Sequence, residues 1–334
     1  MPHFDPLPYA IPVFVALIAA EIAWARRSGH RRAYETRDTA VSLALGLGST
    51  VAGAAAAGMV AAALVWAHAA APLEIGWSWW AWPLCFVLDD LAYYAFHRTA
   101  HRIRWFWAAH VNHHSSQHYN LSTALRQTWT GFIALSFAFR LPLAAIGFEP
   151  GMILTCAAFN LIYQFWIHTE AIGRLPRWFE AVMNTPSHHR VHHATNACYL
   201  DRNYAGTFIV WDKLFGTFEP ERGAEPIRYG LVHQLGSFNL FRAVFHEWAA
   251  IARDLVRAPW RHKLSYLWRE PGWSHDGSRE TSAMIRARRA ASGAGAGCEE
   301  KARSDREKGP EDYSPGPVSR LAWKSLSCPN PGHK

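Results

Sequence analysis

Five long apolar runs, separated by polar segments, constrain the fold of this 334-residue chain more than any other feature. They cover residues 9–25, 39–66, 77–96, 131–148 and 151–167. An α-helix needs about 20 apolar residues to cross the hydrocarbon core of a bilayer, and only helices and closed barrels satisfy their backbone hydrogen bonds there. We therefore expect an all-α integral membrane protein with about four to five transmembrane helices.

Residues at the ends of the runs predict their orientation. The first run stops at Arg26 and Arg27, which places that end in the cytoplasm, and the third begins with several Trp residues, as an aromatic belt at the outer interface does. The last two runs are separated by Glu149-Pro150 and are predicted to form a helical hairpin. Arg140 in its first arm must face protein or a polar cavity. The polar segments after the third and fifth runs should then meet as a cytosolic helical cap.

Composition agrees with a large lipid-facing surface. Half of the residues are hydrophobic, 17 are Trp and 18% are charged, which is low for a soluble protein. The net charge of +8 arises mainly from basic residues beside the apolar runs and in the last hundred residues. This pattern favours anionic lipid headgroups over nucleic acid as the partner. The five cysteines are scattered, so no disulfide framework is expected.

Three histidine boxes in the polar segments form the candidate site. One has the pattern H-x-x-x-H and two have H-x-x-H-H, and spacings of three and four residues put side chains on one face of a helix. A metal ion takes about four to six ligands, and neutral imidazole suits iron, zinc or copper. With one further histidine after the fifth run, the boxes predict two metal ions bound by His97, His101, His110, His113, His114, His168, His189, His192 and His193.

Residues near the boxes are candidates for supporting these ligands, because a metal-bound imidazole usually donates its second N–H to a carboxylate or a carbonyl. Asp90, two helical turns before the first box, Glu170, close to the fifth run, and His188 are the candidates. Isolated histidines are more often surface or packed residues, and we apply this interpretation to His68, His118, His233 and His246.

A histidine-rich metal transporter is the alternative from another class. Transporters place ionisable ligands near the middle of the bilayer, whereas these boxes are expected at one surface. The H-E-x-x-H motif of a zinc peptidase is missing from the sequence. The favoured interpretation is an enzyme with a metal centre beneath the membrane surface.

The segment 90–101 resembles the fatty acid hydroxylase and sterol desaturase superfamily of membrane di-iron enzymes, and the order of the histidine boxes is matched in full. Segments 119–127, 159–170, 184–193, 203–206 and 211–218 look, more narrowly, like the alkylglycerol monooxygenase family within it. The resemblance spans about residues 89–238. The first two apolar runs match only in hydrophobic character, and the tail does not match.

This resemblance implies an O2-dependent monooxygenase in which the nine histidines hold two iron ions and all of them except His168 are the catalytic residues. Such enzymes hydroxylate the carbon next to the ether oxygen of a lipid, and the hemiacetal collapses to an aldehyde and a glycerol, with tetrahydrobiopterin as the electron donor. Arg102 stands where the animal enzymes tend to carry Glu, which leaves a redox protein open as the donor. A fatty acyl, sterol or carotenoid hydroxylase or desaturase would use the same ligands and stays the alternative.

The predicted organisation has four parts. Residues 1–76 form N-terminal transmembrane helices, 77–240 the catalytic domain, 241–289 an amphipathic cytosolic segment, and 290–334 a disordered tail rich in Gly, Ser, Pro and mixed charges. The expected location is the membrane, crossed several times, with the active site at the cytoplasmic face and a lipid as the substrate.

Overall fold

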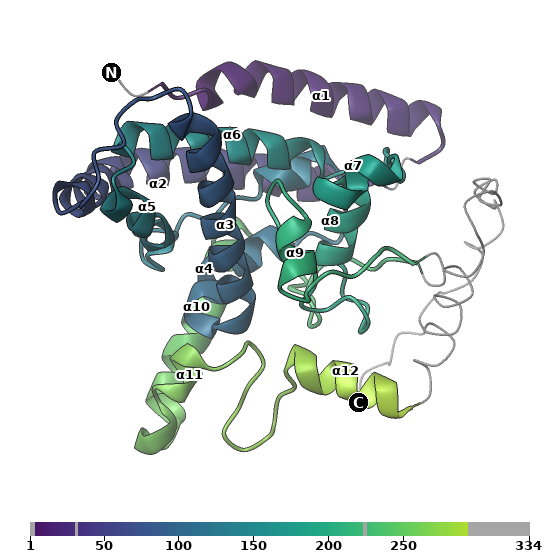
Figure 1. Cartoon of the computed structure of the whole chain (residues 1–334). Helices are drawn as coiled ribbons and strands as arrows, with labels where there is room; N and C mark the ends of the chain where they lie inside the picture. The colour runs from purple at the N-terminus through teal and green to yellow at the C-terminus, as the bar shows by residue number, and fades with distance from the viewer. Residues whose placement is uncertain (1–3, 31–32, 223–225, 293–334) are drawn as a thin grey trace, which may run out of the picture.

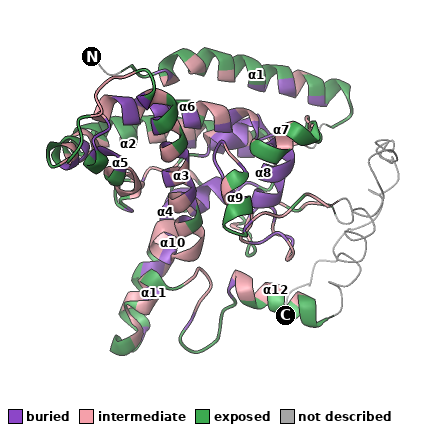
Figure 2. Cartoon of the chain, viewed as in Figure 1, coloured by how far each residue is buried: buried purple, intermediate pink, exposed green. Residues whose placement is uncertain are grey.

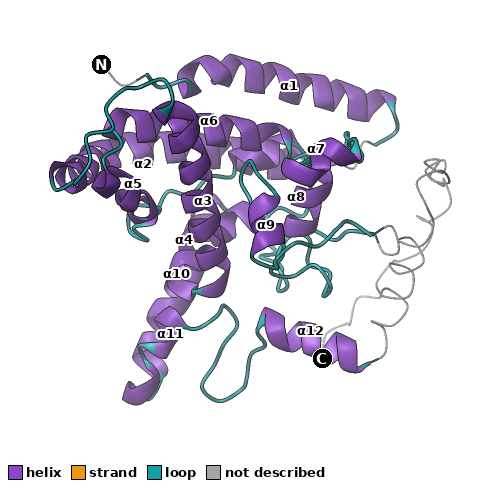
Figure 3. Ribbon diagram, in the orientation of Figure 1, coloured by secondary structure: helices purple, strands orange, loops and turns teal. Residues whose placement is uncertain are grey.

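The computed structural model describes residues 4–30, 33–222 and 226–292 (Figure 1). Within these ranges every regular element is a helix, and strand-like pairing is limited to a single bridge between Met183 and Phe208 (Figure 3). The predicted all-α class is therefore confirmed. The elements are α1 Leu7–Arg27, α2 Thr36–Ala69, α3 Ala81–Arg102, α4 Arg104–His114, η2 Leu121–Leu125, η3 Ser136–Arg140, α5 Leu141–Ile146, α6 Pro150–Trp166, α7 Arg177–Val182, α8 Pro186–His193, α9 Val210–Leu214, α10 Leu240–Arg257, η4 Trp260–His262, α11 Ser265–Trp268 and α12 Ser282–Ala291.

Two of these helices, α1 and α2, are long and apolar enough to cross a membrane. Much of their surface is exposed, as the green segments of Figure 2 show for α1. A lipid-facing helix needs such a surface because hydrocarbon, rather than protein, covers its apolar side chains. At 1.5 Å per residue the 34 residues of α2 extend over about 50 Å, well beyond a hydrocarbon core of about 30 Å.

The fourth apolar run does not form the single helix that we expected. It divides into η3 and the six-residue α5, after Leu135 with a φ of 56°. Pro142 in the first turn of α5 cannot donate a backbone hydrogen bond to the turn before it, which limits a continuous helix. Gly147 ends α5 with a φ of 123°, so the predicted hairpin has a short first arm and a long second arm, α6.

The C-terminal half of α2 packs with α3, α5 and α6 around one apolar core. Leu64, Cys85, Leu143, Met152 and Ile153 are all buried there. Within this layer the expectation for Arg140 is confirmed, because its Nε lies 2.6 Å from Oδ1 of the buried Asp89 and so faces protein.

The chain turns sharply at Ile103, whose extended backbone separates α3 from α4. The next residue, Arg104, is buried and forms ion pairs of 2.6 Å with both Glu247 and Asp254 of α10. These pairs hold α10 against the start of α4. The predicted tail from Ala290 onward falls on residues 293–334, which lie outside the described ranges, except for its first residues at the end of α12.

Candidate metal centre

The nine histidines predicted as ligands lie on four segments that converge in the interior. The last turns of α3, the second half of α4, the residues after α6 and the helix α8 carry them. The helix α8 begins with Pro186 in its first turn, where a missing N–H costs nothing. Its following spacing of three and four residues then presents three imidazoles on one side.

The structure brings all nine together in two adjacent groups. In each group the available ring nitrogens lie within 4.8 Å of one another. The first group comprises His97, His101, His110, His114 and His192. The second, whose members are all buried, comprises His113, His168, His189 and His193.

Backbone carbonyl groups fix the orientation of two rings in the first group. Nδ1 of His97 lies 2.8 Å from the carbonyl oxygen of Tyr204, and Nδ1 of His192 lies 3.0 Å from that of Arg202. A neutral ring that donates from Nδ1 keeps a lone pair on Nε2. The Nε2 atoms of His101 and His192 are buried and have no hydrogen-bond partner among the described residues, so both are available to a metal ion.

Backbone carbonyl groups also orient two rings in the second group. His113 Nδ1 and His168 Nδ1 lie 3.3 and 2.7 Å from the carbonyl oxygens of Arg126 and Gln164. Their Nε2 atoms nevertheless lie only 3.2 Å apart. Because each neutral ring uses its one N–H on a carbonyl, two lone pairs face each other, and a cation bound between them removes the repulsion.

Burial keeps these rings neutral. It lowers the pKa of His110 to about 3, with a further contribution from neighbouring histidines, and it lowers the pKa of His192 to about 4. Only the neutral imidazole has a lone pair for a metal ion. The donor set therefore fits ions that accept imidazole, among them iron and zinc.

Residues 82–217 match the family model described as fatty acid hydroxylase. That stretch is therefore similar to a fatty acid hydroxylase domain. The chain is also 45% identical over 204 residues to an alkylglycerol monooxygenase of Danio rerio, covering 60% of this chain and 45% of the relative. The corresponding protein of Homo sapiens is 46% identical over 195 residues, covering 58% of this chain and 43% of the relative.

A more distant relative is named for a different activity. A cholesterol 25-hydroxylase of Homo sapiens is 27% identical over 146 residues, covering 40% of this chain and 49% of the relative. The chain thus spans less than half the length of each of these curated relatives. No solved structure matched it.

Asp90, which lies within the matched residues, forms hydrogen bonds to neighbouring segments and none to the nine histidines in the described structure. Its carboxylate accepts hydrogen bonds of 2.7–2.9 Å from the side chains of Asn160 and Trp211 and from the backbone N–H groups of Thr207 and Phe208. These bonds hold the segment that carries Tyr204, whose carbonyl orients a ligand. The groups that contact the histidine rings directly are backbone carbonyls. Every residue has one, so the sequence does not reveal which of them support the rings.

Glu170 and His188, the other two candidates for supporting the ligands, also lie outside both histidine groups. Glu170 accepts a hydrogen bond of 3.0 Å from the hydroxyl of Tyr229. That ring stacks on Tyr119, which in turn contacts the imidazole of His193. His188 points its ring toward Phe218 instead of the other histidines. Neither touches a predicted ligand through a hydrogen bond in the described structure.

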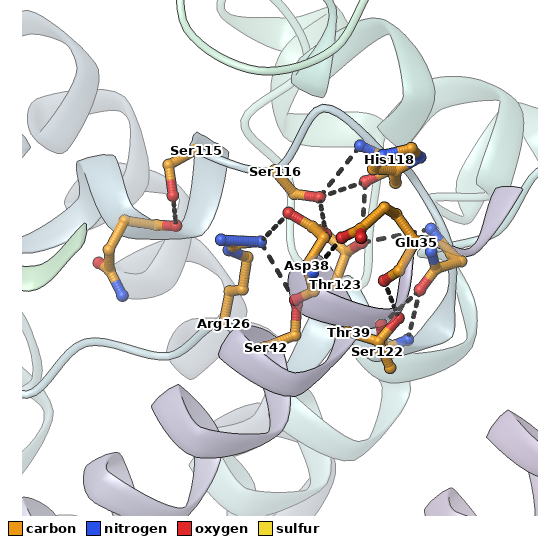
Figure 4. Close-up of polar contacts among 12 residues, drawn as sticks. Glu35, Asp38, Thr39, Ser42, Ser115, Ser116, His118, Ser122, Thr123 and Arg126 are labelled. Atoms are coloured by element: carbon orange, nitrogen blue, oxygen red, sulfur yellow. Dashed lines mark hydrogen bonds and ion pairs between the residues drawn. The ribbon is translucent and has the colours of Figure 1, made fainter. Parts of the chain in front are cut away.

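A buried ion pair between Arg126 and Asp38 is connected to the second group (Figure 4). Arg126 Nη1 lies 2.8 Å from Oδ1 of Asp38 in the first turn of α2, and the hydroxyl of Ser116 donates to the other carboxylate oxygen at 2.5 Å. Ser42 adds a contact to the guanidinium at 3.4 Å. Because the carbonyl of Arg126 orients His113, this pair connects α2 to the orientation of the His113 ring.

Arg102, the departure from the animal enzymes, faces other charges. Its guanidinium forms ion pairs with Asp201 at 3.3 Å and with Glu270 at 3.0 Å. Arg286 of α12 also pairs with Asp201. The side chain thus ties the end of α3 to the C-terminal segment.

A cavity of ≈ 390 Å³ opens directly on the histidines. His101, His114, His192 and His193 form one wall. The remaining wall combines apolar and charged side chains, among them Trp107, Val111, Leu200, Val232, Arg104, Glu247, Arg279 and Glu280. His233 and His246, which we took for surface or packed residues, also line it.

Proposed function

We propose that this chain is a membrane-bound di-iron monooxygenase that hydroxylates a lipid C–H bond next to the ether oxygen of an alkylglycerol. The similarity to a fatty acid hydroxylase domain and the relatives at 45–46% identity support the class of reaction. Hydroxylation at that carbon gives a hemiacetal, which breaks into a fatty aldehyde and a glycerol.

One observation carries the two-metal assignment. The nine ligands divide into two sets, of five and four, each a suitable number for one ion. The opposed Nε2 lone pairs of His113 and His168 favour a cation between those rings. Iron bound at both groups would supply the activation of O2, with electrons from a reduced pterin or a redox protein.

The chain's own residues would position the substrate and exclude water. The histidine wall of the cavity offers the reacting carbon a place beside both groups, while Trp107 and Val111 give an apolar surface for the first part of the alkyl chain. Charged groups such as Arg104 and Glu247 lie at the same cavity and suit the hydroxyls of glycerol. A pocket that fixes one C–H bond near the metal ions lowers the entropic part of the barrier.

A hydroxylase of a fatty acyl chain or a sterol is the second candidate. The similarity to a cholesterol 25-hydroxylase favours it, and so does the 26% identity over 143 residues to a protein of Rhizobium tropici named ornithine lipid hydroxylase. The same ligands would serve either reaction, so the substrate must be determined by assay.

The first experiment determines the metals and the substrate. Protein purified without oxygen is analysed for metal content and by Mössbauer spectroscopy, and we expect two coupled irons per chain. It is then incubated under oxygen with an alkylglycerol, a fatty acid and a sterol, each with and without a reduced pterin. Aldehyde released from the alkylglycerol supports ether cleavage, whereas a product from only another lipid contradicts it.

Single substitutions test the ligand roles. His113→Ala and His192→Ala should each abolish turnover and reduce the metal content, because each removes a ligand from a different group. His188→Ala is the matched control, since this neighbouring histidine lies outside both groups, and it should retain both irons. Full activity in either ligand variant would count against the proposal, provided that all three insert into the membrane equally.

A further inference from the structure

The C-terminal helices carry an apolar face that no described part of the chain covers. It begins on α10 and continues through η4 and α11, with Val256 80% exposed and Trp260 85% exposed. Exposed patches of this kind on soluble surfaces mark contact with a partner or a membrane. The exposed members are Phe241, Phe245, Val256, Trp260, Leu264 and Trp268.

Positions around α10 separate into three stripes. At about 100° per residue, Phe241, Phe245 and Val256 fall on one side together with two exposed alanines. The buried residues Ala243 and Ile251 fall on the side that faces the protein. Between these two stripes lies a third, formed by Arg242, His246, Arg253 and Arg257.

The basic stripe is not neutralised by acidic residues. Both carboxylates of α10 face inward, since Glu247 pairs with Arg104 and Asp254 pairs with Arg104 and Arg279. Among the described residues no carboxylate forms an ion pair with Arg242, Arg253 or Arg257, and the same is true of Arg261 and Lys263 further along. The outward charge of this segment is therefore positive.

An open groove of ≈ 470 Å³ follows the border between the apolar and basic stripes. Phe241, Phe245 and Ala249 line one side, and Arg242, His246 and Arg253 line the other. A phospholipid presents the same two chemistries at one depth, an acyl chain beside an anionic phosphate.

The position of α10 relative to α2 places this face at a membrane boundary. Ala243 and Val244 pack on Val41 and Leu45 in the first turns of α2. Because α2 is longer than a hydrocarbon core is thick, one of its ends must extend into the headgroup region. In Figure 1, α10 and α11 continue one another and run across the direction of α1 and α6, as a helix lying in the membrane plane does.

We propose that the outer face of α10, η4 and α11 docks into the surface of an anionic phospholipid leaflet. The aromatic and aliphatic stripe enters the boundary between headgroups and acyl chains, and the basic stripe contacts phosphate groups. Amphipathic helices with large apolar residues beside Arg or Lys bind membranes in this way.

Docking of this face would bring lipid close to the cavity at the histidines. The meaning of this for substrate access rests on the proposed function. His246 lines both the outer groove and the inner cavity, and Glu247 and Ala250 of the same helix line the inner one. The helix therefore separates the lipid surface from the site by its own width. A lipid would reach the histidines around α10 without leaving the headgroup region.

The test uses the full-length protein in nanodiscs, with a spin label on Val256→Cys and the other reactive cysteines replaced by serine. Accessibility to oxygen, which concentrates in lipid, is compared with accessibility to a water-soluble nickel chelate. In nanodiscs with anionic lipid the label should be open to oxygen and protected from the chelate. A label on the exposed loop residue Ser278→Cys is the matched control and should show the opposite.

A second variant examines the basic stripe. Arg242, Arg253 and Arg257, all exposed, are replaced by Gln in the labelled protein. Each lost charge should weaken protection roughly fivefold, so that more anionic lipid is needed for the same effect.

Two outcomes overturn the proposal. Full chelate access at Val256 in anionic nanodiscs means that the face is in water, and exclusion of both reagents means that protein, such as a second copy, covers it. Neither measurement depends on metal or turnover, so its failure is separate from failure of the proposed function.

Discussion

The rings of His110 and His192 have pKa values of about 3 and about 4 in the fold, below the ordinary value near 6.5. In the folded metal-free protein these two rings therefore stay neutral at pH values at which they are protonated in the unfolded chain. Since the unfolded state binds more protons below pH 6.5, stability must fall as the pH decreases from there toward 4. Above pH 6.5 the rings are neutral in both the folded and the unfolded state, so their contribution to stability does not change with pH.

We expect the metal-free protein to lose stability in that pH window. His192 alone should contribute about 3 kcal/mol between pH 6.5 and 4. Thermal unfolding in nanodiscs at a series of pH values measures the slope. His192→Asn should make it shallower. A slope that is the same in both proteins would show that the His192 ring does not titrate as described.

Asp38 provides a second prediction at this scale, because its carboxylate neutralises the buried guanidinium of Arg126. Asp38→Leu leaves that charge unpaired, which should cost about 3–5 kcal/mol of stability. The shift of the Arg126 carbonyl away from His113 should also weaken metal binding about 10- to 100-fold. Thermal unfolding without metal and metal titration measure the two effects separately.

Two further variants serve as controls for Asp38→Leu. The double variant Asp38→Leu with Arg126→Leu should recover most of the stability, since replacing both partners of a buried pair by apolar groups is often neutral. Glu35→Gln changes a nearby acid whose carboxylate accepts a hydrogen bond from the backbone N–H of Asp38, and its cost should stay near 1 kcal/mol. Unchanged metal affinity in Asp38→Leu would refute the positioning role.

At the scale of elements, the segment 203–207 lies tightly between α3 and α6 at Gly206. A Cβ there would come within 2.7 Å of Asn160 Oδ1 and Asp90 Oδ1 and 2.8 Å of Tyr93 Cδ1. Gly206→Ala should therefore push the segment outward and withdraw the Tyr204 carbonyl from His97. Overpacking should cost about 1–3 kcal/mol.

Metal analysis of this variant should show selective loss. The five-histidine group should bind metal about 10- to 100-fold more weakly, so the content falls from two ions toward one while the four-histidine group is retained. Gly173→Ala, where a Cβ meets nothing within 4 Å, is the matched control. Two ions in both variants would show that this carbonyl is not needed for the group.

The elements that bring the histidines together were partly predictable from the sequence. Spacings of three and four residues on α4 and α8 place side chains on one face, and this geometry follows from helix periodicity alone. The support of His97, in contrast, comes from a main-chain carbonyl of Tyr204, which any residue could supply. The sequence singled out Asp90 as a candidate to support the ligands, but only the fold shows that its partners include Thr207, Phe208 and Trp211.

Hydrophobicity was a weaker guide to element boundaries. The run 131–148 has the composition of a membrane helix, yet Pro142 and the positive φ of Leu135 divide it. Helix breaking depends on single residues and on local backbone geometry, whereas a hydropathy pattern averages over a window. The adjacent run 151–167 is preceded by Pro150, which lies in the first turn of α6, and nearly all of the run forms one helix.

At the scale of the whole molecule, charges in the apolar layer have partners that bind the layers together. Glu21 of α1 is buried and accepts hydrogen bonds from the hydroxyls of Tyr34 and Thr169 and from the backbone N–H of Leu121. Thr169 follows His168 directly, so α1 is attached to the end that carries the second group. Asp38 does the same for α2, which makes the two candidate spans part of the support for the site.

This attachment leads to the last prediction, on topology. Ser28, between α1 and α2, belongs to the histidine-bearing end and should lie in the cytoplasm, while Glu74 after α2 should lie outside. Both are exposed. Single cysteines at these positions, in a chain with its other reactive cysteines replaced, are treated with a membrane-impermeant thiol reagent in sealed vesicles. Ser28→Cys should react only in inside-out vesicles and Glu74→Cys only in right-side-out vesicles. Reaction of both from the same side would mean that α2 does not cross the membrane, and reaction of Ser28→Cys only in right-side-out vesicles would overturn the proposed cytoplasmic position of the metal centre.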